Sequence, residues 1–182
     1  MKLEDMIKGV FAKSYKLFSQ QFVVFIVASL LALFGMIFII TIPPLFFSIY
    51  YMAVQLSKGK TLQISDVWKG FGYFWTSWGM FIVAFVLVVL GLVLLVIPGL
   101  FLMVVFQYAI ALAILEGKGA INALKRSYAI GKQNLVFSIA LFILILLIET
   151  IGGWTRIGVL ITIPFTSLCI VIATQELTKG KK

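Results

Sequence analysis

The sequence predicts an all-α integral membrane protein with six transmembrane helices. Residues 17–57 and 70–115 contain no Asp, Glu, Lys or Arg, and residues 133–175 contain only Glu149 and Arg156. A helix needs about 20 residues to cross the hydrocarbon core of a bilayer. Each tract is therefore long enough for two crossings and a turn, which makes a hairpin. The composition agrees, since 63% of residues are hydrophobic against roughly 45–50% in soluble domains.

The basic residues predict how the helices are oriented. With six crossings, the N-terminal segment, both long connections between hairpins and the C-terminus fall on one side of the membrane. These four regions contain Lys2, Lys8, Lys13, Lys16, Lys58, Lys60, Lys69, Lys118, Lys125, Arg126, Lys132, Lys179, Lys181 and Lys182. Only Arg156 falls on the other side. Because cytoplasmic loops retain Lys and Arg, we expect both termini to be cytoplasmic.

The three tracts resemble copies of one unit. Residues 40–43 (Ile-Thr-Ile-Pro) recur at 161–164, and the same offset pairs Lys-Gly-Lys at 58–60 with Lys-Gly-Lys at 179–181. The middle tract has Ile-Pro at 97–98. Chance similarity between apolar segments is the alternative, but matches of Pro, Gly and Lys at fixed offsets favour an internal repeat.

The segment before each tract repeats as well. Lys-Ser-Tyr at 13–15 corresponds to Lys-Gly-Phe at 69–71 and to Arg-Ser-Tyr at 126–128. We therefore predict a single membrane domain, 1–182, made of three hairpin repeats with the same orientation. Their approximate bounds are 3–60, 64–118 and 121–181.

Each repeat begins with a segment whose apolar residues recur at helical spacing. In the second segment Ser65 is a predicted N-cap, followed by aromatic residues at Trp68, Phe71, Trp75 and Trp78. Aromatic and basic side chains of this kind gather at the headgroup level of a membrane. We predict three amphipathic helices in the cytoplasmic interface. The candidate lipid-headgroup contacts are Lys13, Lys69, Lys125, Arg126 and Lys132.

Few residues could support catalysis. The chain has no histidine and one cysteine, Cys169, and its sequence contains no nucleophile–base set, metal-ligand motif or phosphate-binding loop. We therefore predict no enzyme activity, no cofactor and no metal. Glu149 and Arg156 are predicted to form an ion pair at the outer side. Gln107 is predicted to donate a hydrogen bond between helices.

Three short motifs lie in the central stretch: 97–99 (Ile-Pro-Gly), 116–117 (Glu-Gly) and 123–128 (Ala-Leu-Lys-Arg-Ser-Tyr). With these motifs the stretch resembles a family of small six-helix prokaryotic membrane proteins typified by YciC. It is also similar to the membrane domain of some glycerophosphoryl diester phosphodiesterases. The resemblance implies an integral protein of the prokaryotic inner membrane. It implies little about activity, because members are mostly of unknown function and the phosphodiesterase catalytic domain is absent from this sequence.

Two functions follow as hypotheses. The first is a non-enzymatic membrane protein that interacts with lipid, organises the membrane or serves as an accessory subunit. The alternative is a small transporter or channel for an apolar or lipid-like substrate along a pseudo-threefold axis. The net charge of +9 favours anionic headgroups over nucleic acid as the partner. A second copy of the chain and another membrane subunit are both compatible with this architecture.

Overall fold

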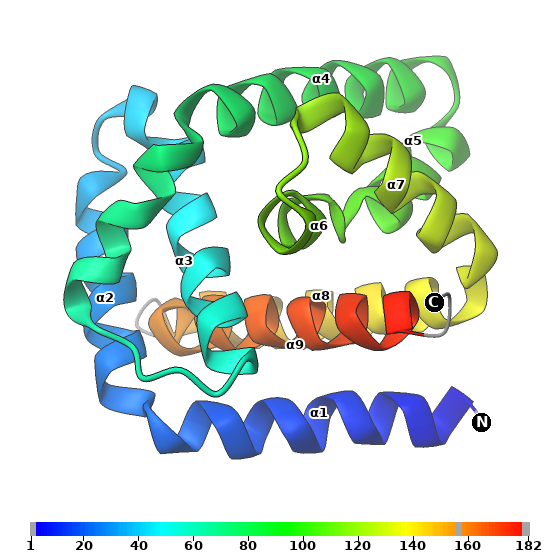
Figure 1. The fold of residues 1–182 in the computed structure, drawn as a ribbon. Coiled ribbons are helices and arrows are strands. Elements are labelled where there is room, and N and C mark those ends of the chain that lie inside the picture. Colours follow the sequence, from blue (N-terminus) through cyan, green and yellow to red (C-terminus); the bar gives the residue numbers. More distant parts are fainter. Residues whose placement is uncertain (1–2, 156–157, 180–182) are drawn as a thin grey trace.

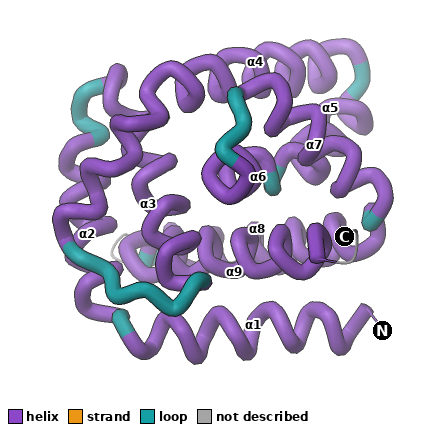
Figure 2. The backbone as a smooth tube through the Cα atoms, viewed as in Figure 1, coloured by secondary structure: helices purple, strands orange, loops and turns teal. Residues whose placement is uncertain are grey.

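The computed structural model describes residues 3–155 and 158–179, and the elements in these ranges are helical, without a strand (Figures 1 and 2). The helical elements are, in chain order, α1 (Leu3–Gln20), α2 (Phe22–Gly35), η1 (Ile39–Thr41), α3 (Ile42–Ser57), η2 (Ile64–Tyr73), α4 (Phe74–Leu94), α5 (Val96–Phe106), α6 (Ala109–Glu116), α7 (Ala120–Gln133), α8 (Leu135–Trp154) and α9 (Val159–Lys179). The elements η1 and η2 are 3₁₀-helices.

Five helical stretches in the described residues are long and apolar enough to cross a membrane. They are Ile39–Ser57, Ile64–Leu94, Val96–Glu116, Leu135–Trp154 and Val159–Lys179. A sixth span is available if α1 and α2, which meet at an angle of 88°, are counted as one broken span. The prediction of an all-helical membrane protein is confirmed at this level.

The centre of the molecule is closed by α3, α6 and α9, which contact one another in pairs. Small buried side chains lie on each of the three helices, and they allow the backbones to approach closely. They are Ser48 and Ala53, then Ala109, Ala111 and Ala113, and finally Ser167, Cys169, Ala173 and Thr174. By contrast, α4 and α8 are largely exposed: 17% and 22% of their most apolar stretches are buried, against 56% for α3 and α9.

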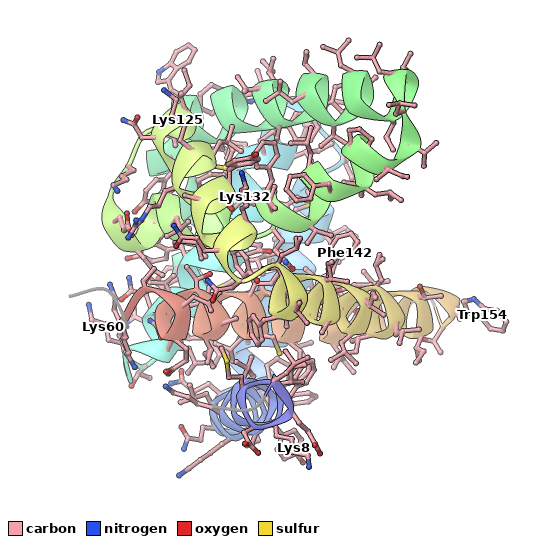
Figure 3. All side chains as sticks on the ribbon, turned by 90° about the vertical axis from the view of Figure 1, so that its right-hand side faces the viewer. Lys8, Lys60, Lys125, Lys132, Phe142 and Trp154 are labelled. Carbon is pink, nitrogen blue, oxygen red and sulfur yellow. The ribbon has the colours of Figure 1, made fainter. Side chains whose placement is uncertain are left out.

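The three segments that precede the hairpins pack on helices of a different hairpin. The helix α1 lies against α9, η2 against α3, and α7 against α5 and α6. Figure 3 shows α1 end-on, whereas α8 runs across the picture toward Trp154. The helix α1 therefore lies crosswise to α8. Figure 3 also shows Lys60 and Lys125 at the end of the molecule opposite Trp154.

Local chemistry explains several helix boundaries. Pro43 and Pro44 occupy the first turn of α3, where a missing backbone N–H costs nothing. The predicted cap at Ser65 is wrong, because Gln63 and Asp66 form a reciprocal capping box at the start of η2. Ser65 instead donates to the Gln63 side chain. A capping box satisfies two backbone donors, which a serine two residues later cannot do.

The hairpin of α4 and α5 turns at a single extended residue, Leu95. It can do so because Gly91 and Gly99 face each other. A Cβ added to Gly91 would lie 2.9 Å from the Gly99 Cα atom. The absence of side chains at both positions therefore sets how closely these two helices pack.

Candidate functional site

A polar cavity lies where α3, α6 and α9 end together. Its volume is about 650 Å³. The walls are formed by the side chains of Lys13, Ser57, Leu112, Leu115, Glu116, Arg126, Gln175, Thr178 and Lys179. We call this the terminal cavity. It brings together five helices, because α1 and α7 add Lys13 and Arg126 to the three helix ends.

The terminal cavity and its rim carry more positive than negative charge. Glu116 pairs with Lys118 at 2.6 Å and with the Arg126 Nε atom at 3.7 Å. Glu176 pairs with Lys13 at 3.2 Å and with Lys179 at 3.3 Å. Four cations thus surround two carboxylates. The Arg126 Nε atom is buried and has no hydrogen-bond acceptor among the described residues.

Cations at this position have a second electrostatic role. The last carbonyl groups of α3, α6 and α9 carry partial negative charge, which Lys and Arg stabilise. Gln175 of α9 also ties two of these ends together, since its Nε2 atom donates to the Ser57 Oγ atom of α3 at 2.8 Å. The terminal cavity therefore gathers polar and charged side chains from five helices, with four cations against two carboxylates at the cavity and its rim.

A second group of predicted residues lies on α7. Lys125, Tyr128 and Lys132 are spaced so that they share one face of the helix. The Lys132 Nζ atom lies 6.0 Å from the centre of the Tyr128 ring, within cation–π range. The same ring contacts Phe101 of α5 edge-on.

The five predicted headgroup residues therefore separate into three places. Lys13 and Arg126 meet at the terminal cavity, while Lys125 and Lys132 lie along α7. Lys69 is exposed on η2 and makes no ion pair with any residue in the described ranges. The sequence alone did not group Lys13 with Lys179 or Arg126. Lys13 and Lys179 meet through Glu176, which lies 163 residues from Lys13, and no local sequence pattern indicates a contact at that separation.

Glu149 is held by α9. Its carboxylate accepts hydrogen bonds from Thr162 at 2.8 Å and from Thr166. These threonines are four residues apart, so both face α8 from one side of α9. Arg156, the predicted partner, lies outside the described residues, and that ion pair stays a prediction. The spacing of the two threonines was the available signal for the partners that sequence reasoning missed.

Gln107 behaves as predicted. Its Nε2 atom donates to the Ser138 carbonyl of α8 at 3.0 Å and to the Val104 carbonyl at 2.8 Å. The neighbouring Tyr108 was not singled out from the sequence, yet its hydroxyl donates to the Ser138 Oγ atom at 2.9 Å. Because Tyr108 is fully buried, this pair is a structural link between α8 and the α5–α6 junction.

The described residues contain no group of three or more His, Cys, Asp or Glu that could hold a metal ion. What they do contain is a set of apolar helices with polar and basic groups gathered at their ends. The fold and the site define an all-helical membrane protein. A family described as "Domain of unknown function (DUF7847)" matches residues 63–179, and the chain belongs to this family. No curated protein and no solved structure matches the chain.

Proposed function

We propose that this protein is a non-enzymatic, multi-pass protein of the prokaryotic inner membrane that binds anionic lipid headgroups at its cytoplasmic side. Its role would be to organise lipid or to serve as an accessory subunit. In this proposal six transmembrane helices form three hairpin repeats. An interfacial amphipathic helix precedes each repeat, and both termini are cytoplasmic. The relationship to the YciC-like proteins and to the phosphodiesterase membrane domain stays a prediction.

Equivalent contacts support the repeat. Ser14 of α1 lies beside Cys169 of α9, and Gly70 of η2 donates its N–H to Ser48 of α3. The offset that pairs Pro43 with Pro164 also pairs Ser48 with Cys169. Ser14 and Gly70 are the middle residues of the repeated segments 13–15 and 69–71, so positions that correspond in sequence make corresponding contacts. The middle residue of the third segment, Ser127 of α7, donates to the Val105 carbonyl of α5.

The interfacial placement of α1 is supported by its two faces. Val10, Ser14 and Phe18 form the buried stripe, whereas Lys8 and Lys16 are exposed. The helix bends by 88° from α2, as expected of a segment that lies in the membrane plane before a crossing. Lysine side chains at this depth extend toward water and anionic headgroups.

The observation that carries the proposal is the meeting of Lys13, Arg126 and Lys179 at the terminal cavity. Positive charge held there by three separate helices suits an anionic group at the membrane surface. The alternative, transport along a central axis, is less well supported. The helices α3, α6 and α9 contact one another, and small apolar and hydroxyl side chains fill the space between them, so among the described residues the polar cavity at their ends is not continued by a path along the axis.

The variant K13Q/R126Q tests this function. Each basic residue near an anionic membrane surface contributes about 1 kcal/mol, so we expect binding of phosphatidylglycerol to weaken about thirtyfold. The full chain, purified in detergent, is titrated with phosphatidylglycerol and followed by native mass spectrometry. K8Q/K16Q removes the same charge from the exposed part of α1 and should change binding much less.

Two outcomes contradict the proposal. One is equal loss of binding in K13Q/R126Q and K8Q/K16Q, which would indicate a non-specific surface charge effect. The other is solute flux across reconstituted vesicles that is abolished by Glu149→Gln, which would support the transporter.

A further inference from the structure

A second cavity, separate from the terminal cavity, lies between α4, α5 and α7. Its volume is about 520 Å³, and we call it the α7 groove. The groove is lined by Val83 and Leu87 of α4, Leu102 and Phe106 of α5, and Ile121, Leu124, Lys125 and Tyr128 of α7. Seven of these eight side chains are apolar or aromatic, and Lys125 is the only charged one.

The charge at this groove is concentrated along one line of α7. Ile121, Lys125, Tyr128 and Lys132 follow each other at spacings of four, three and four residues, which places them in one stripe of the helix. Within the described ranges neither Lys125 nor Lys132 makes a hydrogen bond or an ion pair, and the Lys132 Nζ atom lies 6.0 Å from the centre of the Tyr128 ring. The groove thus has an apolar floor and one cation in its lining, Lys125. A second cation without a carboxylate partner, Lys132, lies about two helical turns further along the same stripe of α7.

The floor of the groove belongs to segments that are able to span a membrane. Val83 and Leu87 lie in the Ile64–Leu94 span, and Leu102 and Phe106 lie in the Val96–Glu116 span. An apolar cleft of this kind binds water poorly, because it offers too few hydrogen-bonding partners. A hydrocarbon chain fits both the walls and the surroundings.

We propose that the α7 groove is a binding site for one anionic phospholipid. An acyl chain lies between α4 and α5, and the phosphate is bound by Lys125 and Lys132. Tyr128 lies between the two cations, where its ring contacts the glycerol region and its hydroxyl faces the headgroup. This inference rests on the proposed function and names a specific site for it. The occupant is a phospholipid because only an amphipathic anion satisfies the apolar floor and the two cations together.

The test uses phosphatidylglycerol with a photoreactive group in its acyl chain, in vesicles that contain the full-length protein. We expect cross-links within 83–87 and 102–106, and we expect K125Q/K132Q to weaken their formation about thirtyfold. Leu87→Trp, which fills the groove without changing charge, should abolish the same cross-links. K58Q/K60Q is the control of equal charge. Circular dichroism and gel filtration establish that each variant is folded.

Three results would overturn the inference. The first is cross-linking that is spread evenly over the lipid-facing helices, and the second is cross-linking that K58Q/K60Q and K125Q/K132Q weaken equally. The third is wild-type protein that elutes as a dimer in gel filtration and forms no lipid cross-links within 83–87 and 102–106, which would indicate that a second copy of the chain covers the groove. The two proposals fail separately. Equal loss of headgroup binding in K13Q/R126Q and K8Q/K16Q, with α7 cross-links that K125Q/K132Q weakens, overturns only the proposed function at the terminal cavity. Selective loss of headgroup binding in K13Q/R126Q, with cross-links spread evenly over the helices, overturns only the α7 groove.

Discussion

Gly70→Ala is expected to destabilise the protein by about 3 kcal/mol, combining overpacking with the loss of a buried hydrogen bond. Gly70 lies on η2 where this segment packs against α3. An added Cβ atom would collide with the Pro44 carbonyl oxygen and with both the Oγ and N atoms of Ser48. Two of these three atoms belong to the backbone of α3, so a change of side-chain rotamer cannot relieve the collision. The Gly70 N–H donates to Ser48 Oγ at 3.2 Å, and separating the segments would break that bond.

Gly72→Ala is the matched control. Gly72 belongs to the same 3₁₀-helix, but an added Cβ atom there would meet nothing within 4 Å. We expect its free energy of unfolding to change by less than about 0.5 kcal/mol. Unfolding in mixed micelles, followed by circular dichroism, measures both variants. Equal stability of Gly70→Ala and Gly72→Ala would contradict the close packing of η2 on α3.

Tyr108→Ala is expected to lower the free energy of unfolding at least as much, by about 3–5 kcal/mol. Tyr108 is fully buried beside the junction of α5 and α6. Removing the ring leaves a cavity in the buried core. It also removes the donor to the Ser138 Oγ atom of α8.

Tyr108→Phe separates the two contributions. The ring is kept and only the hydroxyl is lost, so we expect a cost of about 1 kcal/mol. Ser138 keeps its own acceptor, the Asn134 carbonyl at 3.0 Å, so the Ser138 hydroxyl is not left without a hydrogen bond and the loss of stability stays small. The same unfolding measurement applies. If phenylalanine proved as destabilising as alanine, the hydroxyl contact would dominate and the packing argument would be wrong.

Much of the fold could be predicted because lipid imposes simple requirements. A long uncharged tract must be helical in a bilayer, and this requirement predicted the all-helical fold and the apolar helices that are able to span a membrane. The 3₁₀ conformation of η2 could not be read in this way. The close contact of Gly70 with α3 is likewise present only in the assembled structure.

The candidate site was predictable in kind but not in grouping. Basic residues beside apolar tracts predicted headgroup contacts, and Lys13 and Arg126 were among those named. Their meeting at one cavity depends on α1 packing on α9 and on α7 packing beside α6. Such pairings between distant helices have no local sequence pattern. Glu149 illustrates the same limit, since its partners lie on the next helix.

The most direct test of the account is the sidedness of four positions. Single cysteines replace Lys8, Lys60, Lys118 and Trp154 in a Cys169→Ser background, and a membrane-impermeant maleimide is applied to vesicles of known orientation. Six crossings with cytoplasmic termini predict that positions 8, 60 and 118 react only in inside-out vesicles and position 154 only in right-side-out vesicles. Reaction of positions 8 and 60 from opposite sides would show that only one of α2 and α3 crosses the membrane. It would contradict the three-hairpin architecture on which the lipid sites depend.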